Sequence, residues 1–238
     1  MGLNDSRKVM MSLAHVGVAY RVRAGFMQRR HVWALKDVSF TVYEGESLGI
    51  IGRNGAGKST ILQVLSGIIQ PDRGTITTRK GCNVSLLSLQ TGFVGPLTGR
   101  ENIILNGLFF GIHPHEMKRM LDRIIDFSGI RSFIDQPVNT YSTGMRARLG
   151  FAVAIHADPD IILIDEVLGV GDMEFKEKST AAMRQKISSD KTVIIVSHNQ
   201  ATLTELCDRV ILIEDGVTKM EGSPHDVFAA YRQKKADV

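Results

Sequence analysis

The stretch "GRNGAGKST", Gly52–Thr60, decides the fold of this chain. It satisfies the pattern G-x-x-x-x-G-K-[S/T], in which the glycines let the backbone wrap closely around phosphate groups. An apolar run, "ESLGIIG", leads into the pattern, and a segment with apolar residues at helical spacing, "STILQVLSGII", leads out of it. Strand, glycine-rich loop and helix in this order predict a phosphate-binding loop, and a merely structural glycine-rich turn is a remote alternative.

The whole loop is expected to take part in phosphate binding. Lys58 supplies a positive charge for the β- and γ-phosphates, and the Ser59 hydroxyl is a ligand for Mg²⁺. The expected phosphate-binding residues are Gly52, Arg53, Asn54, Gly55, Ala56, Gly57, Lys58, Ser59 and Thr60. The helix that follows is expected to bury its apolar face, Ile61, Leu62, Val64, Leu65 and Ile68.

Two later apolar runs, "IILIDE" and "TVIIVSH", end in polar residues. Continuous β-branched runs are typical of parallel strands buried on both faces, and an open α/β sheet binds its ligand at the carboxyl ends of such strands. We expect Asp165 on the strand beside the phosphate loop, holding Mg²⁺ directly or through water, and Glu166 as a general base. His198 ends the second run, and position alone does not give a strand-end histidine a catalytic role.

A second anion site is predicted at "YSTGMRARLGFA", Tyr141–Ala152. Ser142, Thr143 and Gly144 stand before a run of good helix formers, so their amides are expected to form a helix N-terminus that attracts an anion. The surrounding region is predominantly helical in pattern, and "HEMKRMLDRIIDFSGI" places one apolar face toward a core. One polypeptide therefore carries two phosphate sites.

The ends of the chain predict antiparallel structure. Two strands, "SLAHVGVAY" and "WALKDVSFTV", are separated by the basic segment "RVRAGFMQRRH", which we interpret as a solvated loop. Near the other end, "RVILIEDGVTKMEG" predicts a hairpin turning at Asp215-Gly216. A final helix is expected after Ser223, which serves as its cap, with Pro224 in the first turn.

Composition fits a globular protein: the 238 residues are 43% hydrophobic. The net charge of +4 comes from 29 basic and 25 acidic residues, which is weak evidence for nucleic acid, and we expect none as a partner. Two cysteines, Cys82 and Cys207, have no metal-ligand spacing and predict free thiols in a reducing compartment. No apolar stretch is long enough for a membrane span.

Taken in order and spacing, "GRNGAGKST", "YSTGM", "IILIDE", "GVGD" and "VSHN" resemble the nucleotide-binding subunit of ATP-binding cassette (ABC) transporters. The resemblance extends from about Ser12 to about Val227. It implies a single α/β domain with a P-loop NTPase (RecA-like) core and an antiparallel β subdomain, residues 12–88 and 156–238. A helical subdomain with the signature motif, residues 89–155, is implied as an insertion.

The resemblance also implies what the two phosphate sites do. In that family the signature motif binds the γ-phosphate of an ATP held on the phosphate loop of a partner copy. The matching residues here are Ser142, Thr143, Gly144 and Met145. Two chains would therefore pack head to tail around two ATP molecules with Mg²⁺. Loss of the γ-phosphate would remove these contacts and open the pair.

Other roles are implied residue by residue. Tyr20 matches the aromatic residue that stacks on adenine, and Gln90 matches the glutamine that senses Mg²⁺. Asp172 matches the loop that couples the two sites, His198 contacts the γ-phosphate, and Glu166 is the catalytic glutamate. The chain departs from the usual Leu-Ser-Gly-Gly-Gln signature in having Tyr-Ser-Thr-Gly-Met, and its spacing from the glutamine to "PLTGREN" is shorter than usual.

Three segments, "YSTGMRARLGFA", "LTGRENI" and "DEVLGVGDMEFKEK", resemble the subgroup that exports bacterial surface polysaccharides such as O-antigens, capsules and teichoic acids. This implies an ATPase at the cytoplasmic face of the inner membrane, bound to two copies of a membrane-spanning permease. Alternatives remain: an ABC ATPase for a lipid or drug, a soluble P-loop ATPase or kinase, or a cassette protein acting on DNA or ribosomes. A GTPase is disfavoured because an Asn-Lys-x-Asp motif is absent.

Overall fold

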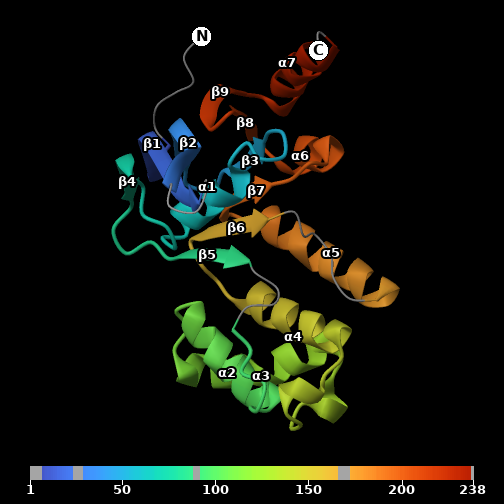
Figure 1. Ribbon diagram of the computed structural model, residues 1–238. Coiled ribbons are helices and arrows are strands. Elements are labelled where there is room, and N and C mark those ends of the chain that lie inside the picture. Colours follow the sequence, from blue (N-terminus) through green and yellow to red (C-terminus); the bar gives the residue numbers. More distant parts are fainter. Residues whose placement is uncertain (1–6, 24–28, 88–91, 166–171, 237–238) are drawn as a thin grey trace. The chain divides into compact units, whose positions relative to one another are not determined.

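The computed structural model describes residues 7–23, 29–87, 92–165 and 172–236, and Figure 1 follows the chain from blue to red. The chain divides into two compact units. The first comprises residues 1–86, 160–166 and 189–238, and the second comprises residues 87–159 and 167–188. The segment predicted as helical, residues 89–155, falls in the second unit.

A mixed sheet forms the framework of the first unit. Its central strand β3 (Ser47–Ile51) pairs in parallel with β7 (Thr192–Val196) and with β8 (Arg209–Glu214). On the far side, β6 (Ile161–Asp165) pairs in parallel with β7. The side chains of these strands are almost all buried, as the continuous apolar runs predict for strands covered on both faces. The predicted α/β core is confirmed.

Strand β6, which ends at Asp165, is not the direct neighbour of β3, the strand that leads into the phosphate loop. The strand order is β4-β1-β2-β9-β8-β3-β7-β6-β5, so β7 separates β3 from β6. An apolar run identifies a buried strand, but the crossover connections decide its place in the sheet, and these leave no local signal in the sequence.

Antiparallel strands extend the sheet on one side. Strand β1 (Val9–Arg23) pairs antiparallel with both β2 (Arg29–Tyr43) and β4 (Arg73–Thr78). The predicted hairpin joins β8 to β9 (Val217–Gly222), and its turn residues Asp215 and Gly216 both have positive φ. Strand β5 (Val84–Leu87) forms the opposite edge.

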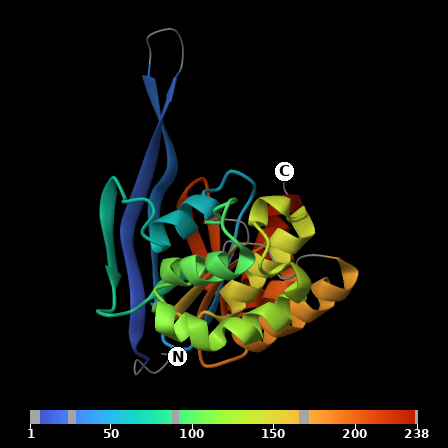
Figure 2. The ribbon, with the colours of Figure 1, turned by 90° about the horizontal axis from the view of Figure 1, so that it is seen from below.

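We expected the basic segment "RVRAGFMQRRH" to be a loop, but the structure shows strand at both of its ends. Strand β1 continues to Arg23 and β2 begins at Arg29, so most of the segment belongs to the two strands. The reason is visible in the alternation of Tyr20 and Val22 with the arginines between them, because this period of two continues the strand pattern. Figure 2 shows the β1–β2 hairpin running well past β4 and α1 (Lys58–Leu65).

Among its described residues, the first unit contains three helices: α1, α6 (Gln200–Leu206) and α7 (Pro224–Ala236). The cap of α7 is as predicted, because the Ser223 hydroxyl accepts a hydrogen bond of 3.2 Å from the Asp226 amide. Ile68, however, is 66% exposed and not part of the buried face of α1. The helix ends at Leu65, before Ile68 reaches that face, and Gly67 follows with a positive φ.

Helices build the second unit. These are α2 (Gly99–Phe109), α3 (Pro114–Ser128), α4 (Thr143–His156), α5 (Met173–Ile187) and the short 3-10 helices Arg131–Phe133 and Val138–Thr140. Met117, Ile124 and Ile125 of α3 are fully buried in the core of this unit, which confirms the predicted apolar face. Buried Asn102 holds the preceding loop to α2, since its amide donates to the carbonyls of Val94, Leu97 and Thr98.

Two further findings bear on chemistry and location. No helix within the described ranges is both long and apolar enough to cross a membrane. Cys82 and Cys207 are free, as predicted, and burial raises the pKa of Cys207 to about 12. The Cys207 thiol is therefore protonated at neutral pH and is not a nucleophile.

An ion pair between Glu46 and Arg209 lies within the first unit. The Glu46 side chain is 2% exposed, and its carboxylate accepts hydrogen bonds from the Arg209 guanidinium at 2.7 and 3.1 Å. Arg209 also donates to Glu221 at 2.8 Å and to the Thr41 carbonyl. The pair therefore joins β8 to β2, to β9 and to the residue preceding β3.

We expect Arg209→Met to lower the free energy of unfolding by about 3 kcal/mol, because it leaves the buried Glu46 carboxylate without its counter-ion. Lys219→Met, an exposed site on β9, is the matched control and should change stability by less than about 0.5 kcal/mol. Urea unfolding of both variants measures the difference. If the two variants unfold with the same free energy, another group must compensate the charge of the buried Glu46 carboxylate.

Candidate functional site

The phosphate loop is organised around Lys58. This side chain is 8% exposed, and its ammonium group donates hydrogen bonds to the carbonyl oxygens of Gly52 at 2.8 Å and Arg53 at 3.0 Å. Gly57, directly before α1, has φ 99°, a conformation that L side chains rarely adopt. The loop thus holds a positive charge beneath the N-terminus of a helix, where an anion is favoured.

A pocket of about 360 Å³ opens at this loop, entirely within the first unit. The predicted phosphate-binding residues that line it are Asn54, Gly55, Gly57, Lys58, Ser59 and Thr60. Gly52, Arg53 and Ala56 are not among its lining residues. The first two accept hydrogen bonds from Lys58, and Ala56 is 5% exposed.

Asp165 and His198 line the same pocket. Asp165 is the last residue of β6, and His198 lies two residues beyond the end of β7. The carboxyl ends of these strands therefore meet the phosphate loop as expected, even though β7 separates the strands of Asp165 and the loop.

Mg²⁺ fits this set of donors. In the part of the chain that the structure describes, no group of three or more His, Cys, Asp or Glu side chains is arranged to hold a metal by itself. The pocket instead offers one hydroxyl, from Ser59, and one carboxylate, from Asp165. Mg²⁺ is commonly bound by one or two such groups together with phosphate oxygens and water, so it would arrive with the nucleotide.

Tyr20 lies beside the start of α1. Its hydroxyl is 3.4 Å from the Thr60 hydroxyl and 3.5 Å from the Gln63 side-chain oxygen. The residue is 42% exposed, so part of its ring is open to a ligand.

Sequence reasoning missed Ala34 and Val196, which also line the pocket. Both are ordinary strand residues without a local signal.

The predicted second anion site is at the N-terminus of α4, in the second unit. The Ser142 hydroxyl caps the helix by accepting a hydrogen bond of 3.1 Å from the Met145 amide. Of the three departures from the usual signature, Tyr141 is buried, Met145 is partly buried and Thr143 is exposed. Tyr141 is 4% exposed and donates a 2.7 Å hydrogen bond to the Phe133 carbonyl, while Met145 packs against the core of the unit. The ends of the motif anchor it, and Ser142 and Thr143 remain exposed.

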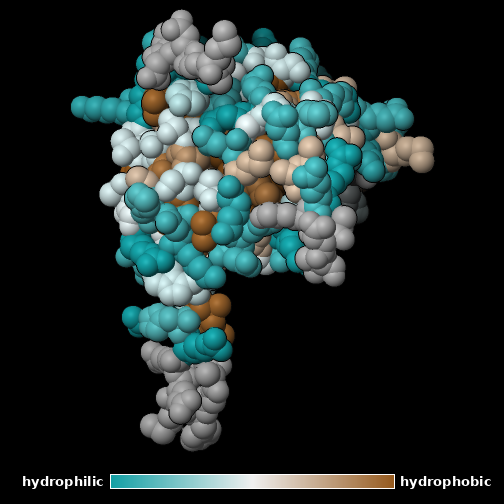
Figure 3. Space-filling view, turned by 90° about the horizontal axis from the view of Figure 1, so that it is seen from above, coloured by the Kyte–Doolittle hydropathy of each residue, from teal (hydrophilic) through white to brown (hydrophobic). Residues whose placement is uncertain are grey.

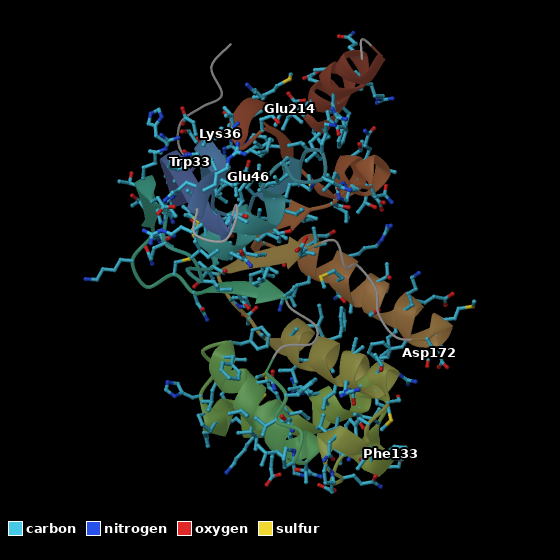
Figure 4. The ribbon with its side chains drawn as sticks, in the orientation of Figure 1. Trp33, Lys36, Glu46, Phe133, Asp172 and Glu214 are labelled. Atoms are coloured by element: carbon cyan, nitrogen blue, oxygen red, sulfur yellow. The ribbon has the colours of Figure 1, made fainter. Side chains whose placement is uncertain are left out.

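Asp172 is at the N-terminal end of α5 (Figure 4). One carboxylate oxygen caps the helix by accepting a 3.1 Å hydrogen bond from the Phe175 amide, and the other accepts a hydrogen bond from Arg148 of α4. Arg148 was missed in the sequence, where 24 residues separate it from Asp172. The pair ties the beginning of α5 to the helix that Ser142 caps. Glu166 and Gln90 lie outside the described residues.

Gly57→Ala tests the loop geometry. A Cβ at this position would lie 2.6 Å from the Ala34 carbonyl oxygen and 2.5 Å from a Leu35 methyl carbon, in addition to the strained φ. Gly55→Ala is the matched control: its φ is also positive, at 82°, but no atom lies within 4 Å of the added carbon. The control should cost about 1–2 kcal/mol of unfolding free energy, and Gly57→Ala should cost more and impair nucleotide binding. Equal effects would contradict the close contact with β2.

Comparison with known proteins places these observations in a family. Residues 35–169 match the family model described as "ABC transporter". Among curated relatives, an ABC transporter protein AbcA of Aeromonas salmonicida is 48% identical over 84% of this chain and 65% of its own length. The O-antigen export system ATP-binding protein RfbB of Klebsiella pneumoniae is 45% identical over 88% of this chain and 85% of its own length.

A third relative, the teichoic acids export ATP-binding protein TagH of Listeria monocytogenes, is 38% identical over 94% of this chain and 70% of its own length. The fold is that of a solved dimeric ATP-binding cassette with ADP and phosphate, which superposes with a TM-score of 0.71 at 23% identity and covers 90% of this chain and 99% of the other. The motifs, the fold and these relatives agree, and the chain belongs to the ABC transporter family as an ATP-binding cassette.

Proposed function

We propose that this chain is the ATP-hydrolysing subunit of an exporter that moves a cell-surface polysaccharide of the O-antigen, capsule or teichoic-acid type across the inner membrane. The observation that supports this most is the pairing of the phosphate-loop pocket with a second, serine-capped helix N-terminus in a chain whose relatives include O-antigen and teichoic acid export proteins. A kinase or GTPase has no use for the second element.

In the proposed reaction, Lys58 and the loop amides bind the β- and γ-phosphates, and Tyr20 stacks on the adenine ring. Ser59 and Asp165, which line the pocket, would hold Mg²⁺, with Gln90 completing its environment. Mg²⁺ would neutralise part of the phosphate charge. Glu166 accepts a proton from the attacking water, and His198 donates a hydrogen bond to the γ-phosphate.

The second half of the site comes from a partner copy. Ser142 and Thr143, which are exposed, together with Gly144 and Met145 would bind the γ-phosphate of an ATP held by the other chain. Asp172, which is bonded to Arg148 of the same chain, would link this contact to the segment that contains Glu166. Two ATP molecules then hold a head-to-tail homodimer together, and hydrolysis releases it.

The partner in the membrane would be two copies of a permease, which keep this subunit at the cytoplasmic face of the inner membrane. A surface suited to this contact lies on α2, where Leu108 is 49% exposed and Phe109 is 70% exposed. Phe93, which is partly buried, packs against the core of the second unit. Exposed apolar side chains next to one another favour a protein partner.

The proposal is tested by purifying the chain, tagged at its C-terminus, in detergent from its native membranes and identifying what accompanies it by mass spectrometry. A small permease in equal amount, with glycan in the same eluate, is the expected result. Recovery of the chain alone, without any membrane protein, would contradict the transporter function. Recovery of a permease together with a lipid or a drug in place of glycan would contradict the polysaccharide assignment and leave the transporter function standing.

A further inference from the structure

The far part of the β1–β2 hairpin is a two-stranded ribbon that is covered only at its base. Val18 and Leu35 are buried there and Tyr20 contacts α1, whereas Arg21, Val22, Arg30, His31 and Val32 are all exposed. Strand β4 pairs with β1 only as far as Gly17, and β2 meets β9 only at Asp37. Beyond these points, residues 18–23 and 29–35 pair only with each other within the described chain. We call these residues the distal ribbon. Such a ribbon is marginally stable alone in water, so a surface that covers it would stabilise it.

The distal ribbon holds the whole formal charge of the chain. Residues 18–35 contain four arginines, Arg21, Arg23, Arg29 and Arg30, and no aspartate or glutamate. The other 25 lysines and arginines, from a total of 29, equal the 25 acidic residues, so the net charge of +4 belongs to this segment. A charge this concentrated favours an anionic partner.

Basic side chains occur on both faces of the ribbon, and exposed valines occur on one of them. Val22 pairs with Arg30 on one face, and Val32 lies on that face as well; Arg21 pairs with His31 on the other face. Val22 and Val32 are each 46% exposed, and Arg21 and Arg30 are exposed too. In Figure 3 hydrophilic and hydrophobic side chains lie next to one another beside the grey tip of the hairpin.

This two-sided arrangement decides between partners. A protein surface would contact one face and leave the arginine of the other unpaired. A second copy of this chain offers no excess of acidic residues, because the remainder of the chain is electrically neutral. A layer of phospholipid headgroups, by contrast, surrounds a narrow ribbon: phosphates reach arginines on both sides, and the valines contact the upper part of the acyl region.

We propose that the distal ribbon binds the anionic phospholipid headgroups of the membrane beside the permease. The inference rests on the proposed function, since it requires the chain to work at a membrane. The ribbon would give the ATPase a contact with the bilayer that is independent of the permease and is weakened by salt.

Flotation of the purified full-length chain with vesicles tests this. Vesicles of phosphatidylglycerol and phosphatidylcholine in equal parts should bind the chain, vesicles of phosphatidylcholine alone should not, and added salt should weaken binding. Arg21→Gln with Arg30→Gln should weaken binding about 25-fold, since each cation near an anionic surface contributes about fivefold. Lys118→Gln with Arg119→Gln, two exposed cations on α3, removes the same charge elsewhere and should change binding less than about twofold.

Equal binding of the chain to both kinds of vesicle, or no binding to either, would overturn the proposal. Equal losses of binding in the two double variants would overturn it as well. So would complete displacement of the chain from the vesicles by inorganic phosphate at the same phosphate concentration, because this would indicate a site for a single phosphate. Loss of self-association in the ribbon variant would assign the ribbon to a second copy. Unchanged ATP turnover and thermal midpoint show that the ribbon variant is folded. If the permease co-purifies but the chain does not bind vesicles, only this inference fails. If the chain binds vesicles but no permease co-purifies, the proposed transporter function fails.

Discussion

Lys58→Ala is expected to abolish ATP hydrolysis and to weaken ATP binding at least about a hundredfold, a loss of about 2.7 kcal/mol. Lys58 lines the pocket, and its ammonium group holds the loop closed through the carbonyls of Gly52 and Arg53. Removing it takes away the positive charge that opposes the β- and γ-phosphates. The loop also loses two hydrogen bonds, so part of the effect is a less ordered cradle.

Thermal unfolding with and without ATP measures this change without relying on activity. A ligand at about a hundred times its dissociation constant stabilises a protein by about 2.7 kcal/mol, and this increment should disappear in Lys58→Ala. Lys80→Ala, at an exposed turn of the first unit, is the matched control and should keep it. If ATP stabilises the Lys58 variant as much as the original chain, the pocket at this loop is not the main phosphate site.

Glu166→Gln is expected to slow ATP turnover at least about a hundredfold while leaving ATP binding nearly intact. The amide keeps the size of the carboxylate and loses its ability to accept a proton from water. Because bound ATP is then not hydrolysed, the variant should accumulate as an ATP-bound dimer. Size-exclusion chromatography with ATP and a single-turnover assay measure the two effects separately.

Glu177→Gln, an exposed position on α5, is the control for Glu166 and should leave turnover unchanged. Near-normal turnover in Glu166→Gln would remove Glu166 as the base. Slow turnover combined with weak ATP binding would indicate a structural role for this carboxylate instead.

Local patterns in the sequence predicted the elements that contain the site. The glycine-rich motif gave the loop before α1, and the serine at position 142 gave the cap of α4, because loop conformation and capping depend on a few adjacent residues. The continuous apolar runs gave β6 and β7 as buried parallel strands. Here each prediction had a physical cause within a short segment.

Two features that the sequence did not reveal depend on contacts between distant segments, and two others are local. The position of β7 between β3 and β6 depends on crossover connections, and the bond between Arg148 and Asp172 joins two helices. The arginines of the β1–β2 hairpin lie in strands because polar and apolar side chains alternate there, although their charge is typical of a solvated loop. Ile68 left the buried face because α1 is shorter than its apolar spacing indicates.

The central claim is that one chain supplies two half-sites and that each ATP is shared by two copies. Two tagged forms, Lys58→Ala and Ser142→Arg, are co-expressed, and complexes containing one of each are isolated through both tags. If the sites are shared, one composite site has both defects and the other has neither, so the mixed pair should hydrolyse ATP although neither form does so alone. A mixed pair as inactive as its parents would contradict the account, because it would place both phosphate contacts on the same chain.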